Sequence, residues 1–418
     1  MIRSLIRLLR GRPPHAQTLN PLPAPTPFAA FATKPDVDVA DLLGRAAVNL
    51  DTPELQRFLA GKTVLVTGAG GSIGSEICRQ IMRFCPASLI LVEQAENNLF
   101  EIDRELREKW LGATITPCVA DICDAIRIAT IFKAHQPQVV LHCAAHKHVP
   151  MMEQNPGEAI KNNVFGTKTV ADAAAEFGTD AFVMVSTDKA VNPTSVMGAA
   201  KRFAELYIQS KNGGVENSTR FLAVRFGNVL GSSGSVVPIF KKQIAAGGPV
   251  TVTHPDMKRY FMTIPEASQL VLQAGAIGHG GEIFVLDMGE PIKIVDLARE
   301  LIQRSGLRVE EDIAIEFTGI RPGEKLYEEL AGLAEETRPT SHAKIRVWQL
   351  PPAETQRVKK GLAILSDAVN GCREDAVIAL ARCVPEYQPD GVIRPGADSD
   401  GFETLPLSGD GEGFTQAA

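Results

Sequence analysis

The sequence of 418 residues contains no uninterrupted apolar run long enough to cross a bilayer, so we expect no integral membrane segment. It has no excess of positive charge either: 43 Lys and Arg stand against 49 Asp and Glu, which argues against nucleic acid as the main partner. Its seven cysteines are odd in number and lack metal-ligand spacing, so we predict no metal site and a reducing, cytoplasmic location. Hydrophobic and charged contents of 44% and 22% are typical of a soluble globular protein.

Acidic residues are also missing from residues 1–35. The first twelve, MIRSLIRLLRGR, alternate arginine with leucine and isoleucine, and two interpretations are open. They form either a short basic helix that associates weakly with an anionic membrane surface, or a solvated tail, which we favour. The proline-rich stretch that follows predicts that residues 1–35 are disordered, and residues 36–60 are expected to form a short helical lead-in.

What the chain does contain is a glycine-rich turn between an apolar run and a helix, in the stretch KTVLVTGAGGSIGSE. Gly68, Gly71 and Gly74, with Ser72 and Ile73 between them, are positioned to bind a pyrophosphate at the start of the helix. The spacing differs from the commoner G-x-G-x-x-G, and an ordinary flexible loop is the alternative. The flanking strand and helix favour a dinucleotide site.

Strand and helix patterns alternate from residue 62 onward. Strands are expected at 63–67, 88–92, 114–119, 138–142, 181–185 and 221–225, and helices at 72–84, 97–110, 125–135 and 156–177. This order predicts an α/β fold with a doubly wound parallel sheet of the Rossmann type. Ligands of such sheets bind at the carboxyl ends of the strands.

Several residues at those strand ends are candidates for cofactor binding. Glu93 ends the second strand, 25 residues after Gly68, where an acid binds both adenosine ribose hydroxyls and repels a 2′-phosphate. That favours NAD over NADP, and a solvated strand-end charge is the alternative. The other candidates are Asp121 and Ile122 after the third strand, the small residues Ala144 and Ala145 after the fourth, and Asn163 in the following helix. Asp121 can also be an isolated loop acid, and we interpret His142, His146 and His148 as polar loop residues rather than a metal site.

The residues directly after the fifth expected strand carry the chemistry. Thr187, Asp188 and Lys189 place a hydroxyl, a carboxylate and an ammonium in a row. A helix then begins near Ser195, and Met197 and Lys201 share one of its faces because they are four residues apart. On local sequence alone, we favour a surface ion pair for Asp188 and Lys189 and core packing for Met197.

Seven motifs, spread in order over about Lys62 to Leu330, carry a resemblance to a known family. They are TGAGGSIGSE, ENNLFEID, AAHKHVPMME, STDKAVNPTSVMGAAKR, RFGNVLGSSGSVVPIF, HPDMKRYFMTIPEA and RPGEKLYEEL. The chain resembles the extended short-chain dehydrogenases/reductases, and more narrowly the bacterial UDP-N-acetylglucosamine 4,6-dehydratases of polysaccharide biosynthesis. The resemblance implies NAD as cofactor, a UDP-sugar substrate, a homo-oligomer and a second, smaller nucleotide-sugar-binding domain interleaved with the sheet.

The chain departs from the superfamily at the catalytic tyrosine, where it has Met197. A thioether cannot exchange a proton, but one branch of these dehydratases is similar in having methionine there. In that branch the resemblance assigns acid–base chemistry to the Asp-Lys pair, here Asp188 and Lys189. We expect Lys189, with a lowered pKa, to remove the C5 proton after oxidation at C4 and Asp188 to protonate the leaving C6 hydroxyl. Thr187 is expected to bind the C4 oxygen, Asp188 to accept the C4 hydroxyl proton, and Lys201 to hold the nicotinamide ribose.

Substrate-binding residues are expected in the second half of the chain and on the loop after the fourth strand. Arg259 and Arg321 are candidates for the diphosphate because a guanidinium binds phosphate oxygens bidentately. The resemblance supports Arg321 and adds Glu324 as a contact to the ribose, whereas a charged loop is the alternative on local sequence. The remaining candidates are Lys147, Asn228, Ser232, Ser235 and Val236.

We therefore predict NAD-dependent 4,6-dehydration of a UDP-N-acetylhexosamine, with the cofactor regenerated. The alternatives are a nucleotide-sugar C4 or C5 epimerase and, in another class, a catalytically silent NAD-binding regulator. The expected domains are the NAD-binding residues 61–227, the nucleotide-sugar-binding residues 228–350, a C-terminal helical segment at 351–384 and a disordered tail at 385–418. Since only about sixty residues precede the glycine turn, we expect a cytoplasmic enzyme.

Overall fold

The computed structural model describes residues 52–212, 218–329, 337–349 and 353–389, all within the compact unit Val37–Ala418. The tails predicted for residues 1–35 and for most of 385–418 lie outside these residues, as does the first part of the helical lead-in. Within the described ranges no helix is both long enough and apolar enough to span a membrane.

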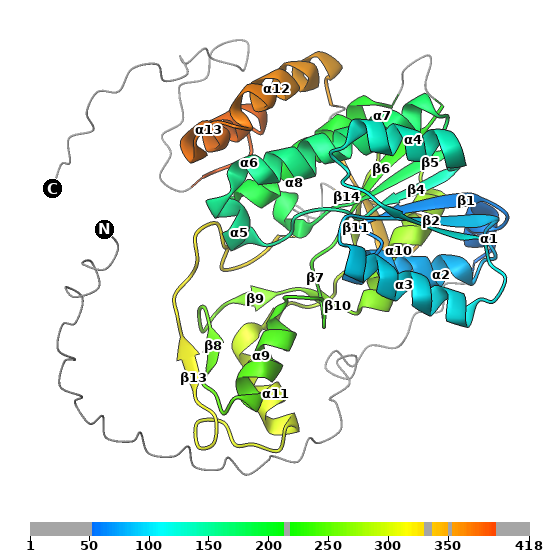
Figure 1. The fold of residues 1–418 in the computed structure, drawn as a ribbon. Helices are drawn as coiled ribbons and strands as arrows, with labels where there is room; N and C mark the ends of the chain where they lie inside the picture. Colours follow the sequence, from blue (N-terminus) through cyan, green and yellow to red (C-terminus); the bar gives the residue numbers. More distant parts are fainter. Residues whose placement is uncertain (1–51, 213–217, 330–336, 350–352, 390–418) are drawn as a thin grey trace, which may run out of the picture. The chain divides into compact units, whose positions relative to one another are not determined.

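One mixed sheet organises the main part of the fold (Figure 1). Among the described residues it has nine strands in the order β14-β15-β11-β6-β5-β4-β1-β2-β3, and all neighbouring pairs are parallel except β14–β15 and β15–β11. Their bounds are β1 (Thr63–Thr67), β2 (Ser88–Glu93), β3 (Ile115–Val119), β4 (Val139–His142), β5 (Ala181–Val185), β6 (Arg220–Arg225), β11 (Ile283–Leu286), β14 (Thr337–Pro339) and β15 (Ile345–Trp348). The order reverses between β1 and β4, as in doubly wound folds, which confirms the predicted fold class.

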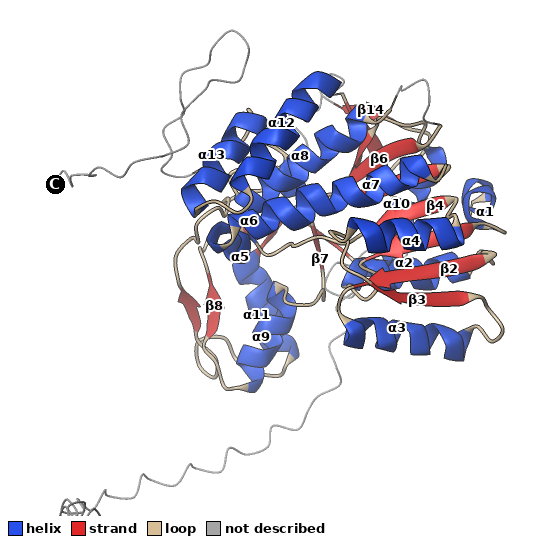
Figure 2. Ribbon diagram, turned by 45° about the horizontal axis from the view of Figure 1, so that its top comes forward, coloured by secondary structure: helices blue, strands red, loops and turns tan. Residues whose placement is uncertain are grey.

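Helices cover both faces of the sheet (Figures 1 and 2). One face carries α4 (Ala125–His135), α7 (Thr167–Glu176), α8 (Val196–Ser210), α12 (Thr355–Ala368) and α13 (Arg373–Cys383), and the other α1 (Pro53–Leu59), α2 (Ser72–Met82), α3 (Glu96–Lys109) and α10 (Ile264–Ile277). Successive strand residues point to opposite faces, so Leu65 belongs to the first hydrophobic cluster and Val64 and Val66 to the second. Strands buried on both faces read as continuous apolar runs, which is why they are visible in the sequence.

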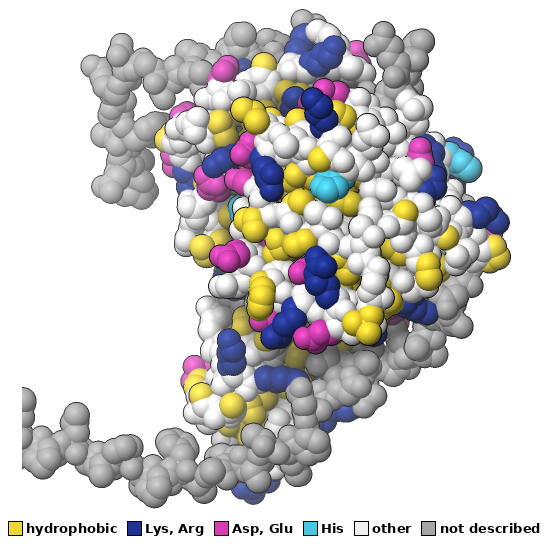
Figure 3. All heavy atoms as spheres, turned by 45° about the vertical axis from the view of Figure 1, so that its right-hand side comes forward, with side chains coloured by type: hydrophobic (Ala, Val, Ile, Leu, Met, Phe, Trp, Pro, Cys, Tyr) yellow, Lys and Arg dark blue, Asp and Glu magenta, His cyan; other side chains and the backbone are white. Residues whose placement is uncertain are grey.

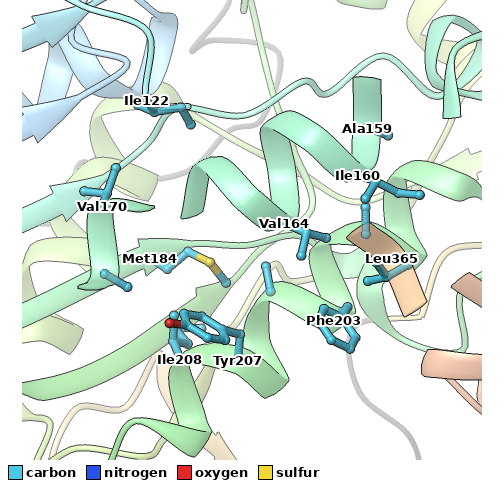
Figure 4. Close-up of a cluster of buried hydrophobic side chains, with 14 of the residues drawn as sticks. Ile122, Ala159, Ile160, Val164, Val170, Met184, Phe203, Tyr207, Ile208 and Leu365 are labelled. Atoms are coloured by element: carbon cyan, nitrogen blue, oxygen red, sulfur yellow. The ribbon is translucent and has the colours of Figure 1, made fainter. Parts of the chain in front are cut away.

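The C-terminal helices belong to the first of these clusters (Figure 4). Leu365 of α12 and Phe203 of α8 are both buried within it. Gly361 lies so close to the Phe203 ring that an added Cβ would stand 2.7 Å from a ring carbon. The α12–α13 pair is therefore packed on α8, the helix that follows the Thr187–Lys189 stretch.

The single helix expected at 156–177 is wrong in one respect, because the chain changes helix type twice there. A short α6 (Pro156–Ala159) leads into a π-helix, η2 (Ile160–Gly166), before α7 begins. Wide π-turns often occur at functional sites, and this one contains the buried Asn163. Helical periodicity alone does not reveal the extra residue in the turn.

A third, smaller hydrophobic cluster lies in the second half of the chain. It is built mainly on α9 (Val236–Ala245), β8 (Val250–Val252) and α11 (Ile294–Arg304), with short pairings of β7 (Asn228–Val229) with β10 (Phe261–Met262), β9 (Lys258–Arg259) with β12 (Ile292–Lys293), and β13 (Ile315–Phe317) with β8. The intervening α10 and β11 belong to the main sheet and its cover. On the face shown in Figure 3, basic and acidic side chains are intermixed.

Candidate active site

The glycine-rich turn joins β1 to α2 and leaves the start of the helix open. Gly68 has φ +64°, and a Cβ there would stand 2.7 Å from the backbone nitrogen of Ala144. A Cβ on Gly74 would stand 2.0 Å from the carbonyl oxygen of Gly68, so only glycine allows this crossing of helix and strand. Gly71 is the N-cap of α2 and provides no side-chain cap, so the first N–H groups of the helix, including those of Ser72 and Ile73, face the turn. This is the backbone arrangement that binds a pyrophosphate.

Glu93 ends β2 beside that turn. Its carboxylate accepts a hydrogen bond from the Gly70 N–H at 3.1 Å and from the N–H groups of Gln94 and Ala95 at 3.0 Å each. The acid predicted to bind the adenosine ribose therefore also braces the glycine-rich turn, a contact that the sequence did not indicate.

The remaining cofactor candidates lie along the same edge of the sheet. Asp121 accepts from the Cys123 N–H at 2.8 Å, and Ile122 is buried against Gly166. Asn163 clamps the loop after β4: its side chain accepts from the N–H of His146 at 2.8 Å and donates to the His146 carbonyl at 2.9 Å. The π-helix thus positions the segment that includes Ala144 and Ala145.

The three histidines do not form a cluster of ligands. His142 is fully buried between the hydroxyls of Thr67 and Thr167, at 2.8 and 2.9 Å, and burial lowers its pKa to about 3. Its neutral ring is a structural link between β4 and α7. Across the described residues, no group of three or more His, Cys, Asp or Glu could hold a metal.

Thr187, Asp188 and Lys189 follow β5 and enter a 3-10 turn, η3 (Asp188–Ala190). One carboxylate oxygen of Asp188, Oδ1, accepts from the Thr187 hydroxyl at 2.9 Å and from the Lys189 ammonium at 3.0 Å. The other, Oδ2, is buried and has no hydrogen-bond partner among the described residues. A buried carboxylate oxygen without a donor is unfavourable, so this atom is available to a hydroxyl of a bound ligand.

The structure corrects the expected protonation of Lys189. Burial lowers its pKa, but the negative charges of Asp188 and then Glu328 outweigh burial, so the net pKa is raised above the ordinary value. The ammonium of Lys189 lies 3.7 Å from Glu328 Oε1, and Arg259 Nε lies 3.6 Å from the same oxygen. Sequence reasoning missed Glu328, whose only signal was its place among several acids in RPGEKLYEEL.

Lys201, unlike Lys189, has a lowered pKa. It is buried on α8, and burial brings its pKa to about 8, although the negative charge of Glu205 opposes the shift. Its ammonium donates to the Val185 carbonyl at 2.8 Å, which ties α8 to the end of β5. Met197, one turn earlier, is buried in the first hydrophobic cluster, so packing accounts for its thioether.

Two loops from different parts of the chain meet beside the glycine-rich turn. The Ser233 N–H donates to the Ser72 hydroxyl at 3.1 Å. Lys147 donates to the Ser233 carbonyl at 2.8 Å and lies 3.5 Å from the Ser232 hydroxyl. The predicted cofactor loop and the predicted substrate loop are therefore in direct contact.

The other substrate candidates on this side differ in how their polar atoms are used. The Ser235 hydroxyl precedes Val236 at the start of α9, and it is buried without a hydrogen-bond partner in the described part of the chain. The Asn228 amide donates to the Tyr260 carbonyl at 3.2 Å. Ser235 thus leaves a free hydroxyl for a ligand, whereas Asn228 already has a protein partner.

The two arginines predicted to bind a diphosphate have different surroundings. Arg259 is buried and donates to the carbonyls of Lys258, Leu326 and Lys325, at 2.7, 3.2 and 2.8 Å. Arg321 is exposed and pairs with Glu324 at 2.6 Å. Arg321 therefore has a guanidinium accessible to phosphate, whereas Arg259 is occupied by backbone and by Glu328.

Contacts from distant segments support the loop that contains Asp188. The Lys325 ammonium donates to the Val191 carbonyl at 3.0 Å, and the Gln388 N–H donates to the Pro193 carbonyl at 2.9 Å. Glu153 accepts from the Val196 N–H at 2.7 Å and also pairs with Arg373 of α13 at 3.5 Å. All of these contacts except the one between Glu153 and Val196 span well over a hundred residues, which is why no local pattern predicts them.

Comparisons with known proteins agree with this arrangement. A family model described as "Polysaccharide biosynthesis protein" matches residues 64–350. The chain is 62% identical over 297 residues to the capsular polysaccharide biosynthesis protein CapD of Staphylococcus aureus, covering 70% of this chain and 49% of CapD. It is 35% identical over 271 residues to a UDP-N-acetylglucosamine 4,6-dehydratase (inverting) of Campylobacter jejuni, covering 64% of this chain and 77% of that enzyme.

Among solved structures, the chain is similar to Pen from Bacillus thuringiensis, with a TM-score of 0.65 and 34% identity over 71% of this chain and 92% of Pen. The chain spans about half the length of CapD, so the match to that relative concerns one part of it. Helices α12 and α13 lie beyond the residues matched by the family model.

Proposed function

Because the chain belongs to the polysaccharide biosynthesis protein family, we propose that it dehydrates a UDP-N-acetylhexosamine at C4 and C6, most simply UDP-N-acetylglucosamine, with NAD as a recycled cofactor. Support comes from the identity to an enzyme named UDP-N-acetylglucosamine 4,6-dehydratase and from the Thr187–Asp188–Lys189 constellation. The observation that carries the proposal is the geometry of Asp188: Oδ1 contacts both Thr187 and Lys189, while the buried Oδ2 has no partner among the described residues.

The residues around the first glycine-rich turn fit NAD. The uncapped start of α2 suits a pyrophosphate, and the carboxylate of Glu93 at the tip of β2 suits a ribose diol and disfavours a 2′-phosphate. Asp121, Ile122, Ala144, Ala145 and Asn163 remain predicted contacts on the same edge. When bound, NAD supplies the acceptor and later the donor of the hydride.

The protein's own residues handle the protons. Asp188 Oδ2 is the atom available to accept the C4 hydroxyl proton, and Thr187 is predicted to bind the C4 oxygen. Lys189 begins as an ammonium, so it can act as the C5 base only after losing a proton. Once Asp188 holds the C4 proton, loss of the Lys189 ammonium proton to solvent leaves a carboxylic acid and a neutral amine in contact at 3.0 Å, a pair with no net charge, as before oxidation. Those are the two forms that C5 deprotonation and C6 hydroxyl departure require.

The test is incubation of the full chain with a panel of UDP- and GDP-sugars in heavy water, read by mass spectrometry. We expect loss of one water and deuterium at C5 from a UDP-N-acetylhexosamine. Asp188→Asn should bind the sugar but form no dehydrated product, because the amide cannot take up the C4 proton or protonate the C6 hydroxyl. An epimerised sugar that has lost no water, with deuterium at C5 for a C5 epimerase and without it for a C4 epimerase, would instead support an epimerase, and an unaltered sugar with bound NAD would support the silent regulator.

A further inference from the structure

Glu328 is an acid in the active site that neither the family resemblance nor the proton transfers described above use. Its side chain is only 3% exposed, and it comes from the segment after β13, far in sequence from β5. Its Oε1 lies 3.7 Å from the Lys189 ammonium and 3.6 Å from Arg259 Nε. A carboxylate this buried is retained in the ionised form only when cations compensate it.

The charged groups around Lys189 form an alternating row of Asp188, Lys189, Glu328 and Arg259. They come from the turn η3, the segment 325–329 and β9. The row carries no net charge while Lys189 is an ammonium. It also carries none once Asp188 has taken up the C4 proton and Lys189 has released its own proton to solvent, because Glu328 then remains paired with Arg259.

We propose that Glu328, held by Arg259, is a positioning residue that keeps the Lys189 amine beside Asp188 before and after Lys189 loses its proton. Arg259 is thereby assigned to Glu328 and to the carbonyls of residues 325 and 326 rather than to phosphate. The inference rests on the proposed dehydratase function for its catalytic meaning, but the charge coupling between Glu328 and Lys189 can be measured without turnover.

The matched pair of variants is Glu328→Gln and Glu329→Gln. Glu329 is the adjacent acid, but it is exposed and contacts Lys325 and Asn192 instead of Lys189. Competitive acetylation of Lys189 with acetic anhydride across a pH series, quantified by peptide mass spectrometry, reports the fraction of neutral amine. Glu328→Gln should move the labelling midpoint down by about one pH unit, since a neighbouring carboxylate favours the ammonium, and Glu329→Gln should leave it unchanged.

Deuterium uptake at C5 supplies the catalytic readout. In Glu328→Gln its maximal rate should fall about tenfold because the amine is no longer held in place, and its rising pH limb should shift downward with the labelling midpoint. Glu328→Asp keeps the charge on a shorter arm, so its midpoint should stay near that of the wild type while the maximal rate falls.

Each outcome decides one of the two proposals. Coincident labelling midpoints and C5 exchange profiles in wild type and Glu328→Gln would overturn the role of Glu328, as would an equal midpoint shift in Glu329→Gln. If Glu328→Gln does not fold, a Glu328→Asp profile identical to wild type in both midpoint and maximal rate would overturn it too. If the labelling midpoint shifts in Glu328→Gln but the wild-type enzyme dehydrates no sugar, the dehydratase assignment is overturned and the charge coupling between Glu328 and Lys189 stands.

Discussion

At the scale of single residues, the site depends on charges kept in a buried setting. Asp188 and Lys189 form an ion pair, whereas Lys201 faces a carbonyl and has its pKa lowered to about 8, mainly by burial. Burying the Lys201 ammonium is unfavourable, so this residue is expected to lower the stability of the fold. Its retention suits the predicted contact with the nicotinamide ribose rather than packing.

Lys201→Met should therefore stabilise the protein at neutral pH, by an amount on the order of 3 kcal/mol, because the folded-state pKa lies about 2.5 units below the ordinary value of 10.5. The unfolded chain binds more protons than the folded chain between about pH 8 and 10.5, so wild-type stability rises with pH through that window relative to the variant. Urea unfolding of both proteins at pH 7 and pH 10 measures the difference. An advantage of the variant that is as large at pH 10 as at pH 7 would contradict a neutralising Lys201.

Glu93 is the residue that we expect to select the dinucleotide. Glu93→Ala should weaken NAD binding relative to NADP by about tenfold, because the charged hydrogen bonds to the ribose and the repulsion of a 2′-phosphate are lost together. The same carboxylate braces the Gly70 N–H, so the substitution should also weaken both dinucleotides in parallel. Titration of each dinucleotide, with Glu93→Gln as the isosteric control, separates the two effects. An unchanged ratio of affinities would remove Glu93 from selection.

At the scale of elements, the sequence predicts the bounds of a helix or strand best where a continuous apolar run or a single apolar face is buried. Strand β5 (Ala181–Val185) and helix α4 (Ala125–His135) have the expected bounds because an apolar run defines the strand and one apolar face defines the helix. The π-turn at Ile160–Gly166 was not predicted, since it changes the hydrogen bonding while the helical pattern of the residues continues. Contacts between residues far apart in the sequence likewise leave no local pattern, which limits the prediction of the site.

Glu328 illustrates that limit. Three acids stand in RPGEKLYEEL, and local sequence gives no reason to prefer one of them. Folding points Glu324 at Arg321, Glu329 at Lys325 and Glu328 at Lys189. The predicted direction of the Lys189 pKa was wrong because the charges of Asp188 and then Glu328 together outweigh burial, and the second of these carboxylates comes from a segment more than a hundred residues away.

At the scale of the whole molecule, the C-terminal helices share the core of the sheet. Leu365→Ala should lower the free energy of unfolding by about 2–5 kcal/mol, because Leu365 is fully buried in the cluster that also holds Phe203. Ser366→Ala, exposed on the next position of α12, is the control and should change stability by less than about 0.5 kcal/mol. Denaturation followed by circular dichroism and by cofactor release should give coincident transitions. An earlier transition for the helices alone would show that residues 351–384 fold as a separate domain.

The Ser233–Ser72 hydrogen bond also bears on the lifetime of the complex with the dinucleotide. A catalyst that returns the hydride to the same sugar molecule ends each cycle with its oxidant restored and has no need to exchange it. The bridge joins the loop predicted to bind the sugar to the first turn of α2, where the pyrophosphate is predicted to bind, so we expect it to slow departure of the dinucleotide. The arrangement suits a nucleotide that stays through many turnovers in the manner of a prosthetic group, while the sugars alone come and go.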